Sequence, residues 1–139
     1  MQAILPVSRF CRVALLFAIL GLTLGGCATL ADNNQRSLRE VITHLEREGL
    51  VISEIQATYY PVVMAEDGCA LYIDGAKVEV YRYDVSKPKI RQKVEKIAAT
   101  GKITICGIDF PAVVNGSFVM LTYSQHERVP DIVAAFRRF

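Results

Sequence analysis

The chain has 139 residues, with 16 lysines and arginines against 14 acidic residues, which leaves room for one domain and an N-terminal segment. Both excess basic residues, Arg9 and Arg12, lie near the N-terminus, so the rest of the chain is neutral. A nucleic-acid-binding protein needs a net basic face. The charge balance therefore excludes nucleic acid as the expected partner.

Basic and acidic residues are nevertheless separated along the chain. Residues 27–76 contain 3 basic and 8 acidic side chains, whereas residues 77–102 contain 8 basic and 3 acidic side chains. A solvated helix face explains such a pattern. A patch that binds a partner protein or lipid headgroups is the alternative.

Residues 1–26 have the composition of an export signal. Residues 1–12 contain two arginines and no acidic residue, and Val13–Leu24 carries no charge. A helix of that length spans about 18 Å, which is too short for a hydrocarbon core about 30 Å thick. A basic start, a short apolar run and small residues instead predict a cleaved signal over residues 1–26.

The signal ends in Leu24, Gly25, Gly26 and Cys27, a sequence that resembles the lipobox of bacterial lipoproteins. The resemblance implies cleavage between Gly26 and Cys27 and attachment of a diacylglyceryl group to the Cys27 thiol. Acylation of the new amine is then also implied, and two or three acyl chains make membrane attachment effectively permanent. An ordinary secretory signal and an uncleaved membrane anchor are the alternatives.

Ala28, rather than aspartate, follows the cysteine. This resembles the lipoproteins that Gram-negative bacteria sort to the outer membrane. The resemblance implies a lipid-anchored protein of the cell envelope, on the outer membrane and facing the periplasm if the cell is Gram-negative. Its expected partners are the membrane, through the lipid, and an envelope protein. No cofactor is expected, and the covalent lipid on Cys27 is the only attached group.

The mature chain divides into a tether and a domain. Residues 27–35 comprise the lipidated cysteine and a small, polar stretch that predicts a short tether. Residues 36–139 predict a single globular domain. Ser37 and Glu40 have the spacing of a capping box, and the apolar stripe after them predicts a helix that stops at Gly49.

Two stretches in which apolar and polar residues alternate follow this helix. Val51–Tyr60 predicts a half-buried strand that ends at Pro61 and has Val51, Ile55, Ala57 and Tyr59 on one face. Cys69–Asp84 predicts a hairpin with Asp74 and Gly75 at its tip. A two-residue loop places six apolar residues on one face, in the pairs Ile73 with Ala76, Leu71 with Val78, and Cys69 with Val80.

The second half of the domain has an order of helices and strands similar to that of the first half, but the amino-acid sequence itself is not repeated. A basic, amphipathic helix is predicted from Ser86 to Gly101, then a strand over Lys102–Cys106. Phe110–Ser124 predicts a second hairpin, with Asn115-Gly116 as its turn. Pro130 marks the start of a last helix.

These elements predict an α+β fold. The expected architecture is an antiparallel sheet of two hairpins plus extra strands, with about three amphipathic helices packed largely on one face. Two stretches, Leu71–Asp84 of the first hairpin and Asn115–Ser124 of the second, also resemble the sequences of small bacterial lipoproteins of uncharacterised function. The resemblance implies no active site.

Cys69 and Cys106 lie in the expected domain, whereas Cys11 lies in the signal. Because export leads to an oxidising compartment, the pair is a candidate disulfide. Strand alternation, by contrast, points the two side chains to opposite faces, so two buried free thiols are the alternative. Redox catalysis is not expected, because the chain has no Cys-x-x-Cys motif.

The sequence contains no recognisable catalytic or metal-binding pattern. His44 and His126 are the two histidines, and neither has a second ligand at metal spacing. A Gly-x-Ser-x-Gly motif and a glycine-rich phosphate loop are both absent from the sequence. We therefore expect no catalytic residue, no metal and no enzymatic activity.

The hairpin carries the remaining candidate site. Tyr72, Tyr81 and Tyr83 are predicted to point away from its apolar face, with Lys77 and Arg82 nearby. They form either cross-strand stacks or a binding face. We expect a membrane-anchored envelope lipoprotein with a non-catalytic binding or structural domain. The alternative is a periplasmic module that binds a solute or lipid in a pocket between sheet and helices.

Overall fold

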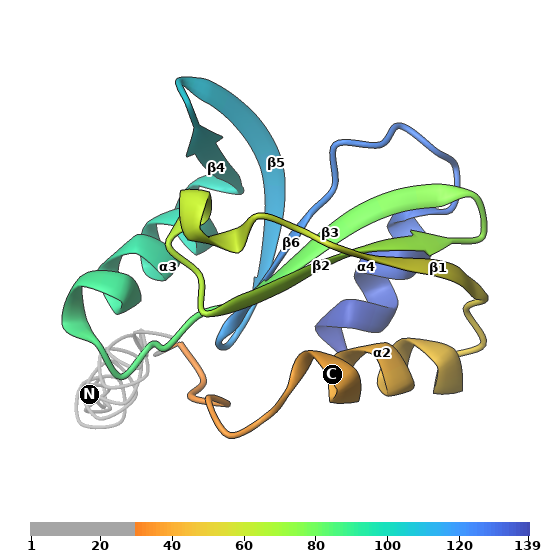
Figure 1. Ribbon diagram of the computed structural model, residues 1–139, viewed down its shortest axis with the longest axis horizontal. Helices are drawn as coiled ribbons and strands as arrows, with labels where there is room; N and C mark the ends of the chain where they lie inside the picture. Colours follow the sequence, from red (N-terminus) through yellow and green to blue (C-terminus); the bar gives the residue numbers. More distant parts are fainter. Residues whose placement is uncertain (1–29) are drawn as a thin grey trace, which may run out of the picture.

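The computed structural model describes residues 30–139 (Figure 1). The predicted signal over residues 1–26, its lipobox and the lipidation site Cys27 lie outside the described residues. Within residues 30–139, no helix is long and apolar enough to cross a bilayer. This part of the chain folds into an antiparallel sheet with three α-helices, which confirms the predicted α+β class.

Six strands form the sheet, in the order β1-β2-β3-β6-β5-β4. All neighbouring strands are antiparallel. The strands are β1 (Ile52–Ala57), β2 (Asp67–Ile73), β3 (Ala76–Arg82), β4 (Lys102–Ile105), β5 (Ile108–Asn115) and β6 (Phe118–Leu121). The helices are α2 (Leu38–Arg47), α3 (Pro88–Thr100), α4 (Val129–Arg137) and the short 3-10 helix η1 (Tyr60–Val63).

The first hairpin has the predicted register. Its tip is Asp74-Gly75, where φ is +49° and +85°, as a two-residue hairpin turn requires. The side-chain pairing is therefore fixed by the turn, and every apolar pair faces the same side. The confirmed pairs are Ile73 with Ala76, Leu71 with Val78, and Cys69 with Val80.

The strand predicted over Lys102–Cys106 is present as β4, and its pairing partner was not predicted from the sequence. It forms a further hairpin with β5, closed by Cys106 and Gly107 at φ values of +50° and +82°. A cysteine at positive φ is uncommon, so the residue types around this turn did not indicate it. The predicted second hairpin is the next one, β5–β6, which turns at Asn115 and Gly116.

The sheet has an apolar core on each face. Neighbouring residues of one strand enter different cores: Val80 lies in the core under α2 and α4, and Tyr81 lies in the core under α3. The prediction that the helices pack largely on one face is correct for α2 and α4, which contact each other (Figure 1). The third helix, α3, packs beside β4 and β5 on the opposite face.

The predicted tether contacts the domain before α2 begins. Leu30 packs against the core under α3. Asn33 and Asn34 hydrogen-bond to the β5–β6 turn, and Asn34 also reaches the segment before α3. Ser37 and Glu40 then form the predicted capping box. The described part of the tether therefore lies against the domain.

Candidate binding groove

A groove lies on the same face of the sheet as α3, over the part that α3 leaves uncovered. One wall is the end of β1 and the segment after it, and the other is the β4–β5 hairpin. Its volume is about 400 Å³, within the range of about 300–1,000 Å³ usual for small-molecule sites. The walls contribute Gln56, Thr58, Tyr59, Val62, Ile105 and Phe110, and the floor contributes Ala70, Lys77, Glu79, Tyr81, Leu121 and Tyr123.

Glu79 is the centre of the polar part of the floor. The Tyr81 hydroxyl donates to its Oε2 at 2.7 Å, and the Tyr123 hydroxyl donates to its Oε1 at 3.0 Å. Lys77 Nζ lies 3.6 Å from the same Oε1. Burial raises the pKa of Tyr123, and burial together with the Glu79 hydrogen bond raises that of Tyr81. Both phenols are therefore protonated donors at neutral pH.

Lys77 completes this cluster as a cation. The neighbouring Tyr123 hydroxyl, and then Glu79, raise the pKa of its ammonium group. Its charge offsets that of Glu79, while both carboxylate oxygens of Glu79 already accept hydrogen bonds. The groove therefore offers aromatic walls and a neutral hydrogen-bonding floor, rather than a free base or a nucleophile.

Thr58 leaves one polar atom unused beside this floor. Its Oγ1 is buried and has no hydrogen-bond partner among residues 30–139. Such an atom is costly unless something pairs with it. The close approach of Thr58 depends on Gly68, because a Cβ there would lie 2.6 Å from Tyr81 Cδ1 and 2.8 Å from Thr58 Oγ1.

The predicted tyrosine face is only partly correct. Lys77 lies on the groove side as predicted, and Tyr72, its partner across the strands, is part-exposed. Tyr81 is only 4% exposed, and Tyr83 is fully buried. The prediction that both form an exposed binding face is wrong, because the apolar stripe of α3 packs over this end of the sheet. Arg82 forms an ion pair with Glu66, 3.5 Å away.

Burial turns Tyr83 into a structural residue. Its hydroxyl donates to the carbonyl oxygen of Val63 in η1 at 3.1 Å. Lys93 of α3 lies over its ring, with Nζ 5.7 Å from the ring centroid. Tyr83 thus connects the sheet with η1 and α3 and takes no part in the groove.

The two cysteines of the domain are not bonded. Cys69 is a buried free thiol in the core under α2 and α4. Cys106 is an exposed free thiol in the β4–β5 turn. The structure therefore contradicts the candidate disulfide between Cys69 and Cys106. The alternative was two buried free thiols, and of these two thiols only Cys69 is buried.

The histidines have structural contacts. His44 Nε2 lies 2.9 Å from the carbonyl oxygen of Ala135 and links α2 to α4. His126 Nδ1 accepts a hydrogen bond from the backbone N–H of Arg128. Within residues 30–139, no three His, Cys, Asp or Glu side chains lie together as a metal site requires.

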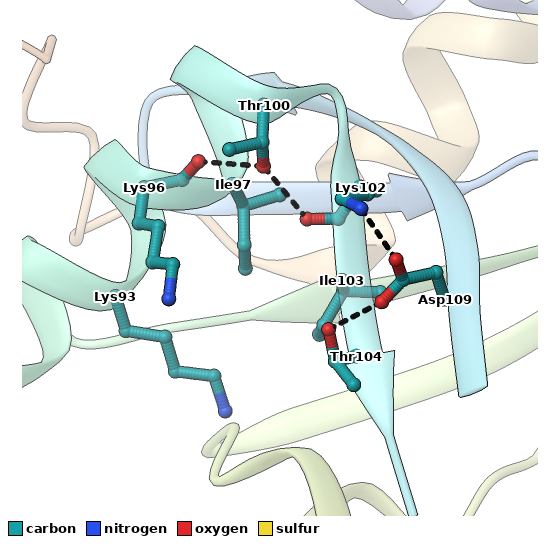
Figure 2. A pocket seen from close by; sticks show the side chains of 8 residues that line it. All are labelled: Lys93, Lys96, Ile97, Thr100, Lys102, Ile103, Thr104 and Asp109. Atoms are coloured by element: carbon teal, nitrogen blue, oxygen red, sulfur yellow. Dashed lines mark hydrogen bonds and ion pairs between the residues drawn. The ribbon is translucent and has the colours of Figure 1, made fainter. Parts of the chain in front are cut away.

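A second hollow lies between α3 and β4 and is lined by lysines (Figure 2). Lys102 forms an ion pair with Asp109, and the Thr104 hydroxyl donates to the same carboxylate at 2.6 Å. Burial lowers the pKa of Lys93, which donates to a backbone oxygen. The hollow lies at the C-terminal end of α3, where the helix dipole disfavours anions. The groove is therefore the stronger candidate.

Sequence reasoning missed an exposed apolar strip at the edge of the sheet. The strand predicted to be half-buried is almost entirely exposed, because β1 is an edge strand that no helix covers fully. We call this strip the edge patch. It consists of Val51, Ile55, Tyr59, Tyr60 and Val62. Tyr59 and Val62 also line the groove, whereas Ile55 pairs with Leu71 of the core under α2 and α4 and so faces the other side of the sheet.

No protein-family model, no curated protein sequence and no solved structure matches this chain. The candidate function therefore rests on the residues and the geometry alone.

Proposed function

We propose that this chain is a lipid-anchored lipoprotein of the cell envelope whose domain binds a protein partner and catalyses no reaction. Lipid on Cys27 would hold it in the membrane, on the periplasmic side of the outer membrane if the cell is Gram-negative. The edge patch and the adjoining groove would bind the partner.

One observation carries this proposal. Among residues 30–139, five of the seven exposed large hydrophobic side chains belong to the edge patch. Tyr59 is 77% exposed and Ile55 is 53% exposed. All of the edge-patch residues lie in or next to the edge strand β1 and the helix η1 that follows it. Scattered apolar side chains are normal on a protein surface, whereas a group gathered at one edge marks an interaction site.

The backbone beside the patch supports an extended partner segment. β1 pairs with β2 on one side and lies at the edge of the sheet on the other. An edge strand presents unpaired N–H and C=O groups, to which an extended peptide can add as a further strand. Aromatic side chains of that peptide would fit the groove beside Tyr59 and Val62.

Substitution of one edge residue tests the proposed surface. Ile55→Arg should reduce recovery of the crosslinked partner from membranes at least tenfold, because a charge enters an apolar interface. Ile108→Arg is the matched control, since Ile108 is 60% exposed on β5, outside the patch. Equal recovery with both variants would count against the edge patch.

A labelling experiment tests the anchor separately. Cells that express the chain and are fed radioactive palmitate should label the wild type and not Cys27→Ser. Equal label in both proteins would contradict a lipid anchor on Cys27. It would not affect the proposal for the binding surface.

The groove supports a second candidate, a periplasmic module that binds a small solute or lipid. The aromatic walls and the hydrogen-bonding Glu79 cluster on the floor suit an amphipathic molecule with one polar end. Native mass spectrometry of the purified protein should then find a bound mass that Val62→Trp, which fills the groove, removes. Wild-type protein without any bound mass would favour the protein partner.

A further inference from the structure

We infer that the start of α3, together with Met64, docks on an anionic phospholipid surface and holds the domain in one orientation. The inference rests on the proposed lipidation of Cys27. We call this surface the docking face. It consists of Met64, Lys87, Pro88, Lys89 and Ile90, which line a shallow depression.

The first argument is the way the N-terminal segment is fixed. Asn33 Oδ1 accepts a hydrogen bond from the Ser117 backbone N–H at 2.5 Å. Asn34 Oδ1 accepts from the Ser117 hydroxyl at 2.7 Å and from the Val85 backbone N–H at 3.1 Å. Asn34 Nδ2 donates to Asp84 at 3.2 Å. These bonds hold the segment against the loop that leads into α3.

The second argument is the reach of the chain. Leu30 packs against the core under α3, and Asp32 lies 3.9 Å from Arg91 in the first turns of that helix. Cys27 precedes Leu30 by three residues, which span at most about 11 Å when fully extended. A lipid on Cys27 therefore brings the beginning of α3 to the membrane surface.

The third argument is the chemistry of the docking face. Met64 is 60% exposed, and Pro88 and Lys89 beside it are exposed too. Within residues 30–139, Lys89 forms no ion pair, whereas Lys87 pairs with Glu66 and Asp84. An apolar side chain between lysines suits the boundary between phosphates and acyl chains.

The charges around this face favour an anionic surface. Five cations lie near it, against the three carboxylates of Asp32, Glu66 and Asp84 that pair with them. No side chain caps the N-terminus of α3, so its positive dipole end adds to the cations. The cations are Arg82, Lys87, Lys89, Arg91 and Lys93.

A single tryptophan tests the orientation, because the chain contains none. The full-length lipoprotein with Met64→Trp would be placed in vesicles of phosphatidylethanolamine and phosphatidylglycerol that contain brominated lipid. We expect quenching of Trp fluorescence at position 64 at least threefold stronger than for Glu46→Trp, which lies on the exposed side of α2. Equal quenching at both positions would overturn the inference.

Two further variants separate the docking face from the anchor. Lys89→Glu should reduce the quenching at position 64 about threefold, and Asn34→Ala should reduce it by freeing the segment. Flotation of the vesicles reports the anchor independently. Protein that floats without position-specific quenching would overturn docking alone, whereas protein that does not float would remove both docking and the proposed anchor.

Discussion

The side-chain oxygen of Asn34 accepts a hydrogen bond from the hydroxyl of Ser117 at 2.7 Å, although 83 residues separate the two. Ser117 is fully buried, so its hydroxyl depends on this partner. Asn34 lies within the segment predicted to be a tether. The two residues show that the domain uses part of this segment to complete its own interior.

Asn34→Ala should therefore destabilise the whole domain. A buried hydroxyl left without a partner costs about 1–3 kcal/mol, and the bonds to Val85 and Asp84 are lost as well. Urea denaturation should show this loss. Gln35→Ala is the control, because Gln35 is exposed. If both variants unfold at the same urea concentration, the segment does not belong to the domain.

Thiol chemistry should distinguish the two cysteines. Burial, and then the nearby Asp67, raise the pKa of Cys69 to about 11, so its reactive thiolate is scarce at neutral pH. Cys106 is exposed. Iodoacetamide should alkylate Cys106 in the folded protein, and Cys69 only after unfolding. Peptide mapping measures both sites, and a peptide that joins the two cysteines would contradict the free thiols.

Gly68→Ala should destabilise the domain through a clash at the end of the groove. The new Cβ would lie 2.6 Å from the Tyr81 ring, and overpacking of this kind costs about 1–3 kcal/mol. A double-mutant cycle with Tyr81→Ala checks the cause, because removal of the ring should reduce the cost of the added methyl group and leave only its contact with Thr58 Oγ1 at 2.8 Å. Additive losses of free energy would show that the clash is not with Tyr81.

The stability of the domain should fall as the pH rises above about 10. Burial raises the pKa of Tyr81, Tyr83 and Tyr123. Above the ordinary tyrosine pKa the unfolded chain therefore loses phenolic protons that the folded chain retains, and unfolding becomes more favourable. Urea midpoints between pH 8 and 11 measure the fall. Tyr83→Phe should make it shallower, and an identical slope would contradict this cause.

The sequence predicted the parts of the fold that local patterns determine. The register of β2 and β3 follows from the Asp74-Gly75 turn and from apolar residues that alternate around it. Ser37 and Glu40 likewise predicted the capped start of α2. In both cases neighbouring residues contain the whole signal.

Features that depend on distant packing could not be predicted in this way. Alternation shows which residues share a face and not what covers that face, so the exposure of Ile55 and the burial of Tyr83 were both missed. Either face of the sheet could have accepted the apolar stripe of α3. Prediction of the groove would have required the exposure of β1 and the position of the β4–β5 hairpin, because these two elements form its walls.

The central claim is that a lipid-anchored domain binds a protein partner through its edge patch. Its most direct test is a photoreactive amino acid at Tyr59, activated in intact membranes and followed by mass spectrometry. The account predicts one discrete protein adduct from position 59 and none from the control position Ile108. No adduct at position 59, or the same adduct from both positions, would contradict it.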